Sequence, residues 1–332
     1  MISTLAAWNG RRSRIPFDMF ALERSAEEAR KLPKLRNIYH RGQELAWDGR
    51  EVLGELLAKH GGIHVDEDKR RALARVFEII LWGELAAWKI SAELADELVP
   101  VEAKMAATSQ AHDEARHFYV MYDYLRELGY TPTRIDPCSQ RVLDLTLEAP
   151  KLTYKILGMQ LMIETIALTI FQTVRESRVE PVLADLLLYY EKDEARHVGL
   201  GTQYLPALLR KMSPAEGVAT TLFQLRIVFW TLTSLKAMER DLATLGITAP
   251  KLIHHGRAKQ MAVFEELWRD GTPPATGEWV NRIMNGVEDA IFPGLDAPRD
   301  LRSRLARFRT AFAVTRAAGT DDAVEQLRQA QG

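Results

Sequence analysis

The sequence predicts an all-α protein whose core is a four-helix bundle. Apolar residues recur at helical spacing for about 180 residues from Asp66 onward, with few strand signals. The pentapeptide Asp-Glu-Ala-Arg-His occurs twice, at 113–117 and 193–197, and each copy follows a lone glutamate in an apolar segment by the same interval. A repeat of this kind indicates duplication, so we expect two related helical hairpins in one bundle.

The core helices are expected between clear start and stop signals, such as Asp66 before the first and Gly129 after the second. Their predicted ranges are 67–98, 101–128, 151–178 and 182–211. The positions of two prolines agree with the two predicted hairpin turns. If the ligands of a hairpin lie at one height, each turn falls halfway between them, at 99, next to Pro100, and at 179, two residues before Pro181. Proline is well tolerated as a first helical residue, so both turns agree with the spacing.

Further helices are expected around this core. An amphipathic helix is predicted at 37–59, the portion 139–148 of the central connection is a weaker candidate, and a strong helix follows at 215–245. From Pro250 onward we expect three or four shorter helices, interrupted at 271–276 and 293–298. We therefore predict a single domain over 1–332, with a dimetal-binding core at 66–211 and helices at 212–332 that cover the core or build a pocket.

The spacing inside each pentapeptide brings a carboxylate and an imidazole together. Residues three apart on an α-helix project from the same face, so the glutamate and histidine of one copy can reach one metal ion. The upstream glutamates lie 30 residues earlier in both halves (114 − 84 and 194 − 164) and complete the set. Four-helix bundles hold paired iron or manganese ions with this ligand pattern. The predicted metal ligands are Glu84, Glu114, His117, Glu164, Glu194 and His197.

The chemistry of the ligands limits which metal ions the site would bind. Carboxylate and imidazole together suit iron and manganese, whereas carboxylates alone would suit magnesium or calcium and thiolates would suit zinc. Cys138 is the only cysteine and lies in a proline-rich turn, so it is not a ligand candidate. We expect two Fe per chain, with a Mn/Fe pair as the alternative.

Two of these assignments have competing interpretations. A single Glu-x-x-His on a helix is usually a solvated surface pair, but two copies with matched upstream glutamates favour a metal site. On the first helix Glu78 is a rival to Glu84, and only Glu84 reproduces the interval. Glu164 lies in the run Leu-Met-Ile-Glu-Thr-Ile-Ala-Leu, where burial of an unpaired carboxylate would be costly and metal coordination would remove the cost.

Residues beside the ligands are candidates for supporting roles. Asp113 and Asp193 would each accept a hydrogen bond from the non-coordinating nitrogen of the histidine on the partner helix, and Arg116 and Arg196 would balance their charge. Ordinary surface ion pairs are the alternative for these four residues. Four other residues either border the metal cavity or pack in the core. They are Gln160, Tyr190, Met121 and Leu168.

Composition sets broader limits. A net charge of −1 gives no basic excess for nucleic acid, and one cysteine fits a reducing compartment, so we expect a cytoplasmic protein. Residues 1–16 do not have the pattern of a cleaved secretion signal. The apolar segment 157–174 contains Gln160, Glu164 and Gln172, which favours a core helix carrying a ligand over a membrane span.

The ligand pattern resembles that of the ferritin-like di-iron carboxylate superfamily over residues 66–211 and the helix that follows. The Asp-Glu-x-Arg-His form is similar to the hydroxylase subunits of bacterial multicomponent monooxygenases. The run His-Val-Gly-Leu-Gly at 197–201 is similar to the ribonucleotide reductase small subunit and its ligand-binding oxidase relatives. The resemblance implies a ferritin-like four-helix bundle with additional N- and C-terminal helices, and reductive activation of O2 at two metals.

At several positions the sequence differs from the patterns of individual families within this superfamily. Met121 stands where the reductase small subunits have their radical tyrosine, and the tail 326–332 lacks their acidic and aromatic docking residues. Ala86 and Met159 replace the valine and tyrosine that form a crosslink in the ligand-binding oxidases. Tyr190 stands where the arylamine oxygenases have an additional histidine ligand.

We therefore expect an O2-dependent di-iron oxidase or oxygenase that hydroxylates, desaturates or otherwise oxidises a small, largely apolar organic molecule. An external electron donor and a homodimer follow from the resemblance alone. A ferroxidase or metal-storage protein is the alternative, disfavoured by the 121 residues that follow the fourth core helix (332 − 211). A hydrolase with a manganese or zinc pair is disfavoured by the symmetrical set of six ligands.

Overall fold

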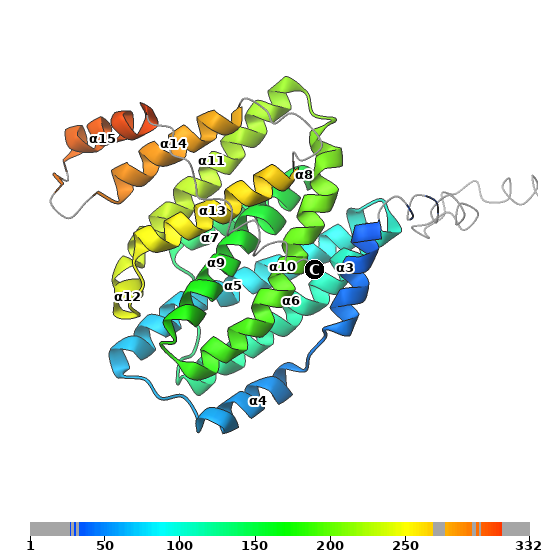
Figure 1. Cartoon of the computed structure of the whole chain (residues 1–332), viewed down its shortest axis with the longest axis vertical. Coiled ribbons are helices and arrows are strands. Elements are labelled where there is room, and N and C mark those ends of the chain that lie inside the picture. Colours follow the sequence, from blue (N-terminus) through cyan, green and yellow to red (C-terminus); the bar gives the residue numbers. More distant parts are fainter. Residues whose placement is uncertain are drawn as a thin grey trace, which may run out of the picture.

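The computed structural model describes residues 33–267, 276–293 and 300–313, together with positions 27, 30, 297 and 298. The predictions made for 1–16, for most of the break at 271–276 and for the tail 326–332 lie outside these residues. Every regular element in the described part is a helix, so the prediction of an all-α fold is confirmed (Figure 1).

Four long helical segments form the core bundle, and α5 pairs with α6 as α9 pairs with α10 (Figure 1). Their bounds are α5 Glu67–Glu97, α6 Val101–Glu127, the continuous run of α8 Leu152–Ile156, η2 Leu157–Ile163 and α9 Glu164–Ser177, and α10 Pro181–Leu209. The turns fall at 98–100 and 178–180, where the ligand spacing predicts them. The Glu180 side chain accepts hydrogen bonds from the N–H groups of Val182 and Leu183 and so caps α10.

Two apolar clusters fill the bundle, one on each side of a polar layer. On α5, Phe77 and Leu81 belong to one cluster and Ile90 and Leu94 to the other, with Glu84 between them. The same order holds on α6 and α10, where the repeated pentapeptides separate the two clusters. The polar layer therefore lies at mid-height in the bundle, between two apolar regions.

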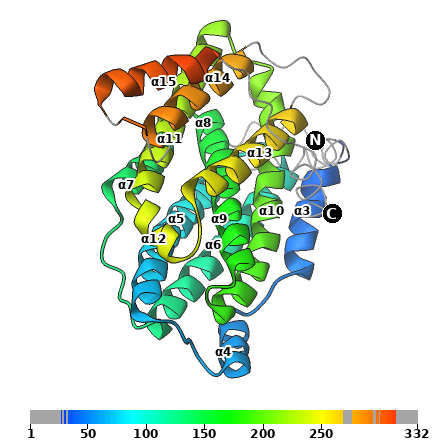
Figure 2. The same ribbon diagram turned by 60° about the vertical axis from the view of Figure 1, so that its left-hand side comes forward.

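The segment 37–59 forms two helices, so the prediction of one helix there is wrong. Helix α3 (Pro33–Glu44) and α4 (Gly49–His60) are separated at 45–48, and both pack against α6 and α10 (Figure 2). Asp48 causes the break, because its side chain accepts the N–H groups of Arg50 and Glu51 and so begins a new helix. The break turns Trp47 toward the polar layer, where its indole N–H bonds Asp193.

The third core helix contains a π-helical stretch, η2, immediately before Glu164. The N–H of Glu164 bonds the carbonyl of Met159, five residues earlier. The wider turn leaves carbonyls without their usual partners. The Gln260 side chain donates to two of them, Leu161 O at 3.1 Å and Met162 O at 3.2 Å. A π-helix of this kind often occurs at a functional site, and this one directly precedes a predicted ligand.

The remaining helices cover one side and one end of the core, with α13 over α9 and α15 on α14 (Figure 2). They are α7 Pro137–Leu147, α11 Pro214–Ala237, α12 Glu239–Thr244, α13 Ala249–Leu267, α14 Thr276–Ile291 and α15 Leu301–Ala313. The weaker candidate helix at 139–148 corresponds to α7. The single helix predicted at 215–245 is in fact α11 and α12, which separate at Met238. Arg75 of α5 pairs with the buried Asp241 and so directs α12 toward the bundle.

Within the described residues, two helical segments are long and apolar enough to cross a membrane by length and composition alone. One is 152–177, and 78% of its most apolar window is buried, as in the core helix of a bundle. The other is α11, with 33% of its window buried. This criterion is weak for one or two helices, because core helices also satisfy it, and the absence of a membrane span stays a prediction.

Replacing Gln260 with leucine should lower the free energy of unfolding by about 1–2 kcal/mol, because two carbonyls of η2 lose their donor. Urea denaturation measures the change. Gln224 provides the matched control, since its side chain lines the same cavity as that of Gln260 but makes no hydrogen bond. Its replacement with leucine should lower the free energy of unfolding by less than about 0.5 kcal/mol. Equal losses in the two variants would contradict this account of η2.

Candidate metal centre

The six predicted ligands meet in the polar layer of the bundle. Each of the four core segments contributes at least one of them, and every one is at most 4% exposed. α5 contributes Glu84 and α9 contributes Glu164, while the pentapeptides on α6 and α10 each provide a glutamate and a histidine. Glu78, the rival on α5, lies outside this group, because its carboxylate accepts hydrogen bonds from the Tyr130 hydroxyl and the Thr133 N–H.

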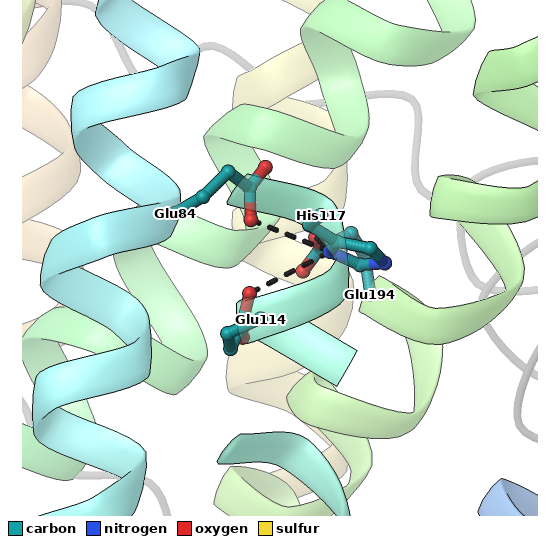
Figure 3. Close-up of side chains that lie close together, drawn as sticks. All are labelled: Glu84, Glu114, His117 and Glu194. Atoms are coloured by element: carbon teal, nitrogen blue, oxygen red, sulfur yellow. Dashed lines mark ion pairs between the residues drawn. The ribbon is translucent and has the colours of Figure 1, made fainter. Parts of the chain in front are cut away.

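The two pentapeptide glutamates lie between the two histidines. Glu114 places Oε2 3.6 Å from Nδ1 of His117 and Oε1 3.0 Å from Nδ1 of His197. Glu194 does the same, with Oε1 3.3 Å from Nδ1 of His117 (Figure 3). Its Oε2 lies 3.1 Å from Nδ1 of His197. Each of these carboxylates therefore faces both imidazoles and could bridge two metal ions.

The upstream glutamates occupy the two ends of the arrangement. Glu84 Oε2 lies 3.3 Å from Nδ1 of His117 (Figure 3). Glu164 belongs to the other end, with His197. The ligand atoms form two overlapping groups, each within 4.8 Å, and the pentapeptide glutamates are common to both. The groups are Glu84, Glu114, His117 and Glu194, and Glu114, Glu164, Glu194 and His197.

The free lone pairs at the centre fit metal ions. Three ligand atoms are buried without a hydrogen-bond partner: Glu114 Oε2, His117 Nδ1 and Glu194 Oε1. Buried polar atoms are rarely left in this state, and here all three belong to the same group of side chains. A cation between them would satisfy all three. A donor set of carboxylates and imidazoles suits iron or manganese.

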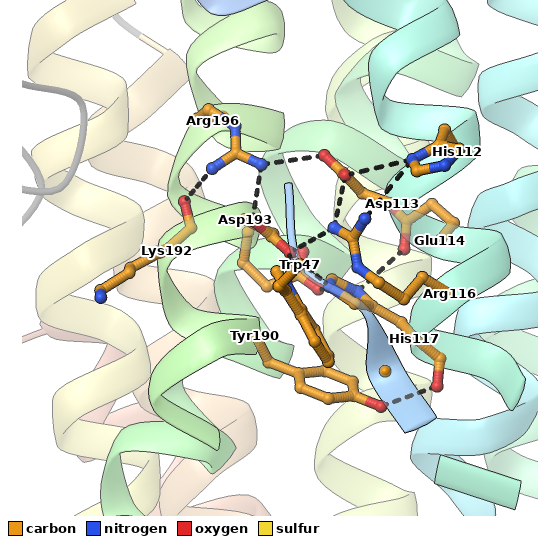
Figure 4. Close-up of polar contacts among 12 residues, drawn as sticks. Trp47, His112, Asp113, Glu114, Arg116, His117, Tyr190, Lys192, Asp193 and Arg196 are labelled. Atoms are coloured by element: carbon orange, nitrogen blue, oxygen red, sulfur yellow. Dashed lines mark hydrogen bonds and ion pairs between the residues drawn. The ribbon is translucent and has the colours of Figure 1, made fainter. Parts of the chain in front are cut away.

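Beside the ligands, two aspartates and two arginines form a buried network (Figure 4). Arg116 Nη2 donates to Asp113 Oδ1 at 2.6 Å and to Asp193 Oδ2 at 2.8 Å. Arg196 Nη2 donates to Asp113 Oδ2 at 2.9 Å and to Asp193 Oδ1 at 2.5 Å. All four side chains are at most 6% exposed, so they are not an ordinary surface ion pair.

The same aspartates approach the far nitrogens of the histidines. Asp193 Oδ2 lies 3.0 Å from Nε2 of His117, and Asp113 Oδ2 lies 3.4 Å from Nε2 of His197. Each aspartate thus faces the histidine of the partner helix. Such a contact fixes the ring so that Nδ1 points to the centre.

Two aromatic residues support His117. Trp47 donates its indole N–H to Asp193 Oδ2 at 2.8 Å (Figure 4). The Cζ atom of Arg116 lies 4.7 Å from the centre of the Trp47 ring. Tyr190 stacks on the His117 ring at 4.2 Å and donates its hydroxyl to the His117 carbonyl at 2.7 Å. Sequence reasoning missed Trp47, which lies outside the repeat and has no spacing signal.

Gln110 is a second polar residue that the sequence reasoning missed. Its Nε2 donates to Glu114 Oε1 and to Glu164 Oε1, both at 3.0 Å. A signal was present, because Gln110 lies 80 residues before Tyr190 (190 − 80), the same offset that relates the two pentapeptides. Aligning the two halves would have placed it one turn before Glu114, on the ligand face.

The four candidate pocket residues are all buried, at 0–2% exposure. The structure also has an apolar cavity beside α11, and none of the four residues lines it. Met121 and Leu168 pack in the apolar clusters, and Tyr190 packs on His117. Gln160 is fully buried and neither amide atom has a partner. His112, which was not expected to be a ligand, is exposed and lies 3.8 Å from Asp113.

The surroundings divide the titratable groups into two classes. Burial raises the pKa values of Glu84 and Glu164. Burial acts in the opposite direction on the two histidines, but the carboxylates that contact their rings outweigh it and raise both pKa values. Burial also opposes ionisation of Asp193, yet the hydrogen bond to His117 outweighs it and lowers that pKa to about 2. Without metal, these shifts therefore favour the protonated forms of Glu84, Glu164, His117 and His197.

Replacing Trp47 with phenylalanine should lower the free energy of unfolding by about 1.5–3 kcal/mol, because a charged acceptor loses a buried donor while the ring remains. Chemical denaturation of the metal-free protein measures this. Trp88 offers the control, as its ring is 40% exposed on α5, and its replacement should change stability by less than about 0.5 kcal/mol. A loss at position 47 no larger than at position 88 would contradict the supporting role.

The pKa shifts also predict opposite pH trends with and without metal. His117, His197, Glu84 and Glu164 have raised pKa values, so the stability that they give the metal-free fold is lost as pH rises through those values. Metal needs the deprotonated ligands and so stabilises more as pH rises. The gain in Tm on anaerobic Fe(II) loading should therefore increase between about pH 5.5 and pH 8. A constant gain would contradict metal binding by these groups.

Comparisons with known proteins bear on the fold. No protein-family model matches this chain, and the search of curated proteins found no match. Among solved structures the chain is similar to protein 19 with aldehyde deformylating oxidase activity from Synechococcus, with a TM-score of 0.51 and 14% sequence identity over 61% of this chain and 92% of that chain. This likeness and the all-helical bundle show that the chain has a ferritin-like fold.

Proposed function

We propose that this protein is an O2-dependent dimetal oxidase that acts on a small, largely apolar organic molecule. The proposal rests on one observation above all, the two overlapping groups of ligands that share Glu114 and Glu194. Paired metals in four-helix bundles are held by ligand sets of this composition. The fold shared with a protein described by its aldehyde deformylating oxidase activity supports an oxidation as the reaction class.

The proposed metals are two irons, or one manganese and one iron. Glu84 and His117 would hold one and Glu164 and His197 the other, with Glu114 and Glu194 between both. Bound there, the pair would supply reductive activation of O2, with electrons from an external donor. The protein groups orient the ligands and exclude water, since Asp113 and Asp193 hold the far histidine nitrogens and all the ligands are buried.

Iron oxidation for storage is the alternative use of such a centre. A cavity of about 460 Å³, lined mainly by aliphatic side chains, lies beside the core helix that carries Glu164. Organic ligands occupy pockets of this size and character, whereas iron ions need a polar route. The cavity therefore favours an organic substrate.

Elemental analysis after anaerobic Fe(II) loading, followed by measurement of O2 uptake, tests the function. The proposal expects about two metals per chain and O2 consumption that rises when an apolar substrate is added. Less than about one metal per chain would overturn it. Mineral formation with turnover of iron alone would establish the storage function instead.

Replacing Glu84 with glutamine should reduce the metal content by about one ion per chain and abolish O2 uptake, because one position loses its terminal carboxylate. Glu78 is the matched control: it is buried on the same helix, but its carboxylate bonds Tyr130 and Thr133. Glu78→Gln should keep the parent metal content even where it lowers Tm. A loss of metal in both variants would contradict the assignment of Glu84.

A further inference from the structure

Beyond the ligands themselves, the interior of the bundle contains buried polar atoms that have no hydrogen-bond partner in the described part of the chain. Close to the carboxylate centre these atoms are Ser91 Oγ on α5, Gln110 Oε1 on α6 and both amide atoms of Gln160 in η2. The three residues are 0–2% exposed. Buried polar groups nearly always have a partner, so three such residues from three helical segments are an unusual concentration.

The three residues lie on the same side of the polar layer. Gln110 and Gln160 precede the ligand glutamates of their helices by one turn, and Ser91 follows the ligand glutamate of α5 by two turns. Apolar residues at these heights all belong to one of the two apolar clusters. They are Ile90, Ala107 and Met159.

On the opposite side of the layer, two buried tyrosines are hydrogen-bonded. Tyr190 donates to the His117 carbonyl at 2.7 Å, and Tyr124 donates to Glu180 at 3.1 Å. Both tyrosines belong to the other apolar cluster. The unpartnered groups therefore distinguish one side of the carboxylate centre from the other, and they indicate the side on which a ligand would be recognised.

The contacts of Gln110 fix the orientation of its amide. Nε2 donates to Glu114 Oε1 and to Glu164 Oε1, both at 3.0 Å, so Oε1 points away from these carboxylates. A free carbonyl oxygen is therefore held beside Glu164.

Gln160 lies between η2 and α10. A Cβ at Gly201 would be only 2.9 Å from Cβ of Gln160, so the missing side chain at 201 allows this close approach. Gly201 is one turn after His197, and Gln160 is one turn before Glu164. Gln160 is thus one turn from each of two ligands that belong to the same candidate metal group.

The free atoms determine which chemical group they can bind. The Gln160 amide nitrogen and the Ser91 hydroxyl can donate, and the amide oxygens of Gln160 and Gln110 can accept. A hydroxyl or a primary amide satisfies both kinds of atom, because it donates as well as accepts. A carboxylate can only accept, and it would also be repelled by the ionised glutamates of the centre. A neutral group is therefore favoured over an anion.

We propose that Gln160, Gln110 and Ser91 form a polar subsite, which binds a neutral hydroxyl or primary amide group of the organic substrate beside Glu164 and His197. This inference rests on the proposed function, because it specifies the polar group of that substrate. Binding at the polar subsite requires no metal, so it can be tested independently of O2 chemistry.

The first test measures the stability of the metal-free full-length protein. A polar group that is kept for a ligand destabilises the ligand-free fold. Gln160→Leu removes the unpartnered amide and should raise Tm by at least about 1 °C. Gln172→Leu is the matched control, since Gln172 is half-buried on α9, and it should leave Tm within about 0.5 °C of the parent value. An unchanged or lower Tm for Gln160→Leu would show that the amide is already bonded, to the protein or to a buried water, and would overturn the proposal.

The second test measures binding to the metal-free protein by fluorine NMR. Trifluoroethanol and trifluoroacetamide are the neutral probes, and trifluoroacetate is the matched anion. Both neutral probes should bind at least roughly tenfold more tightly than the anion. Gln160→Leu should weaken their binding at least roughly tenfold, whereas Gln172→Leu should bind as the parent does. Equal binding by the two variants, no binding by the parent, or tighter binding of the anion would contradict the proposal.

Metal analysis separates this inference from the proposed function. Gln160→Leu should keep the metal content of the parent after anaerobic Fe(II) loading, since no ligand is changed. Loss of metal in this variant would assign Gln160 to the support of the ligands and would rule out the polar subsite. Failure of the parent to bind metal would count against the proposed function, while the probes would still decide whether the polar subsite binds a neutral group.

Discussion

The burial of four carboxylates and two imidazoles in one layer is the constraint on which the structure depends. Ionised groups without partners are very costly in an apolar interior. Here the glutamates and histidines face one another, and the network of Asp113, Asp193, Arg116 and Arg196 sums to zero charge while holding both rings. The apolar clusters on either side fix the height of this layer, so the packing of the bundle and the geometry of the centre cannot vary independently.

Much of the fold and the centre could be predicted because the repeated ligand spacing indicates which residues lie at the same height on neighbouring helices. The interval of 30 residues selects Glu84 over Glu78, although both are buried on α5, and the structure places only Glu84 with the histidines. The same interval locates the turns at 98–100 and 178–180. Helical periodicity does the rest for long segments whose apolar faces meet in one core.

The features that escaped prediction depend on contacts between distant parts of the chain. The π-helix η2 lies just before Glu164 and therefore outside the repeat interval, and Gln260, nearly 100 residues later, supplies the donor for its carbonyls. The position of Trp47 depends on the break at Asp48 and on an acceptor 146 residues away. No local pattern encodes these pairings, since propensity and spacing describe only neighbours along one helix.

The two halves of the repeat have not remained equal. Tyr190 and Gln110 occupy equivalent positions, yet one stacks on His117 and the other bonds Glu114 and Glu164. Asp193 has a buried indole donor, whereas Asp113 has the exposed His112 beside it. A chimera built from two copies of either hairpin would keep every ligand and still lose half of this supporting set. The two hairpins thus diverged after the duplication, and each now provides supporting contacts that the other lacks.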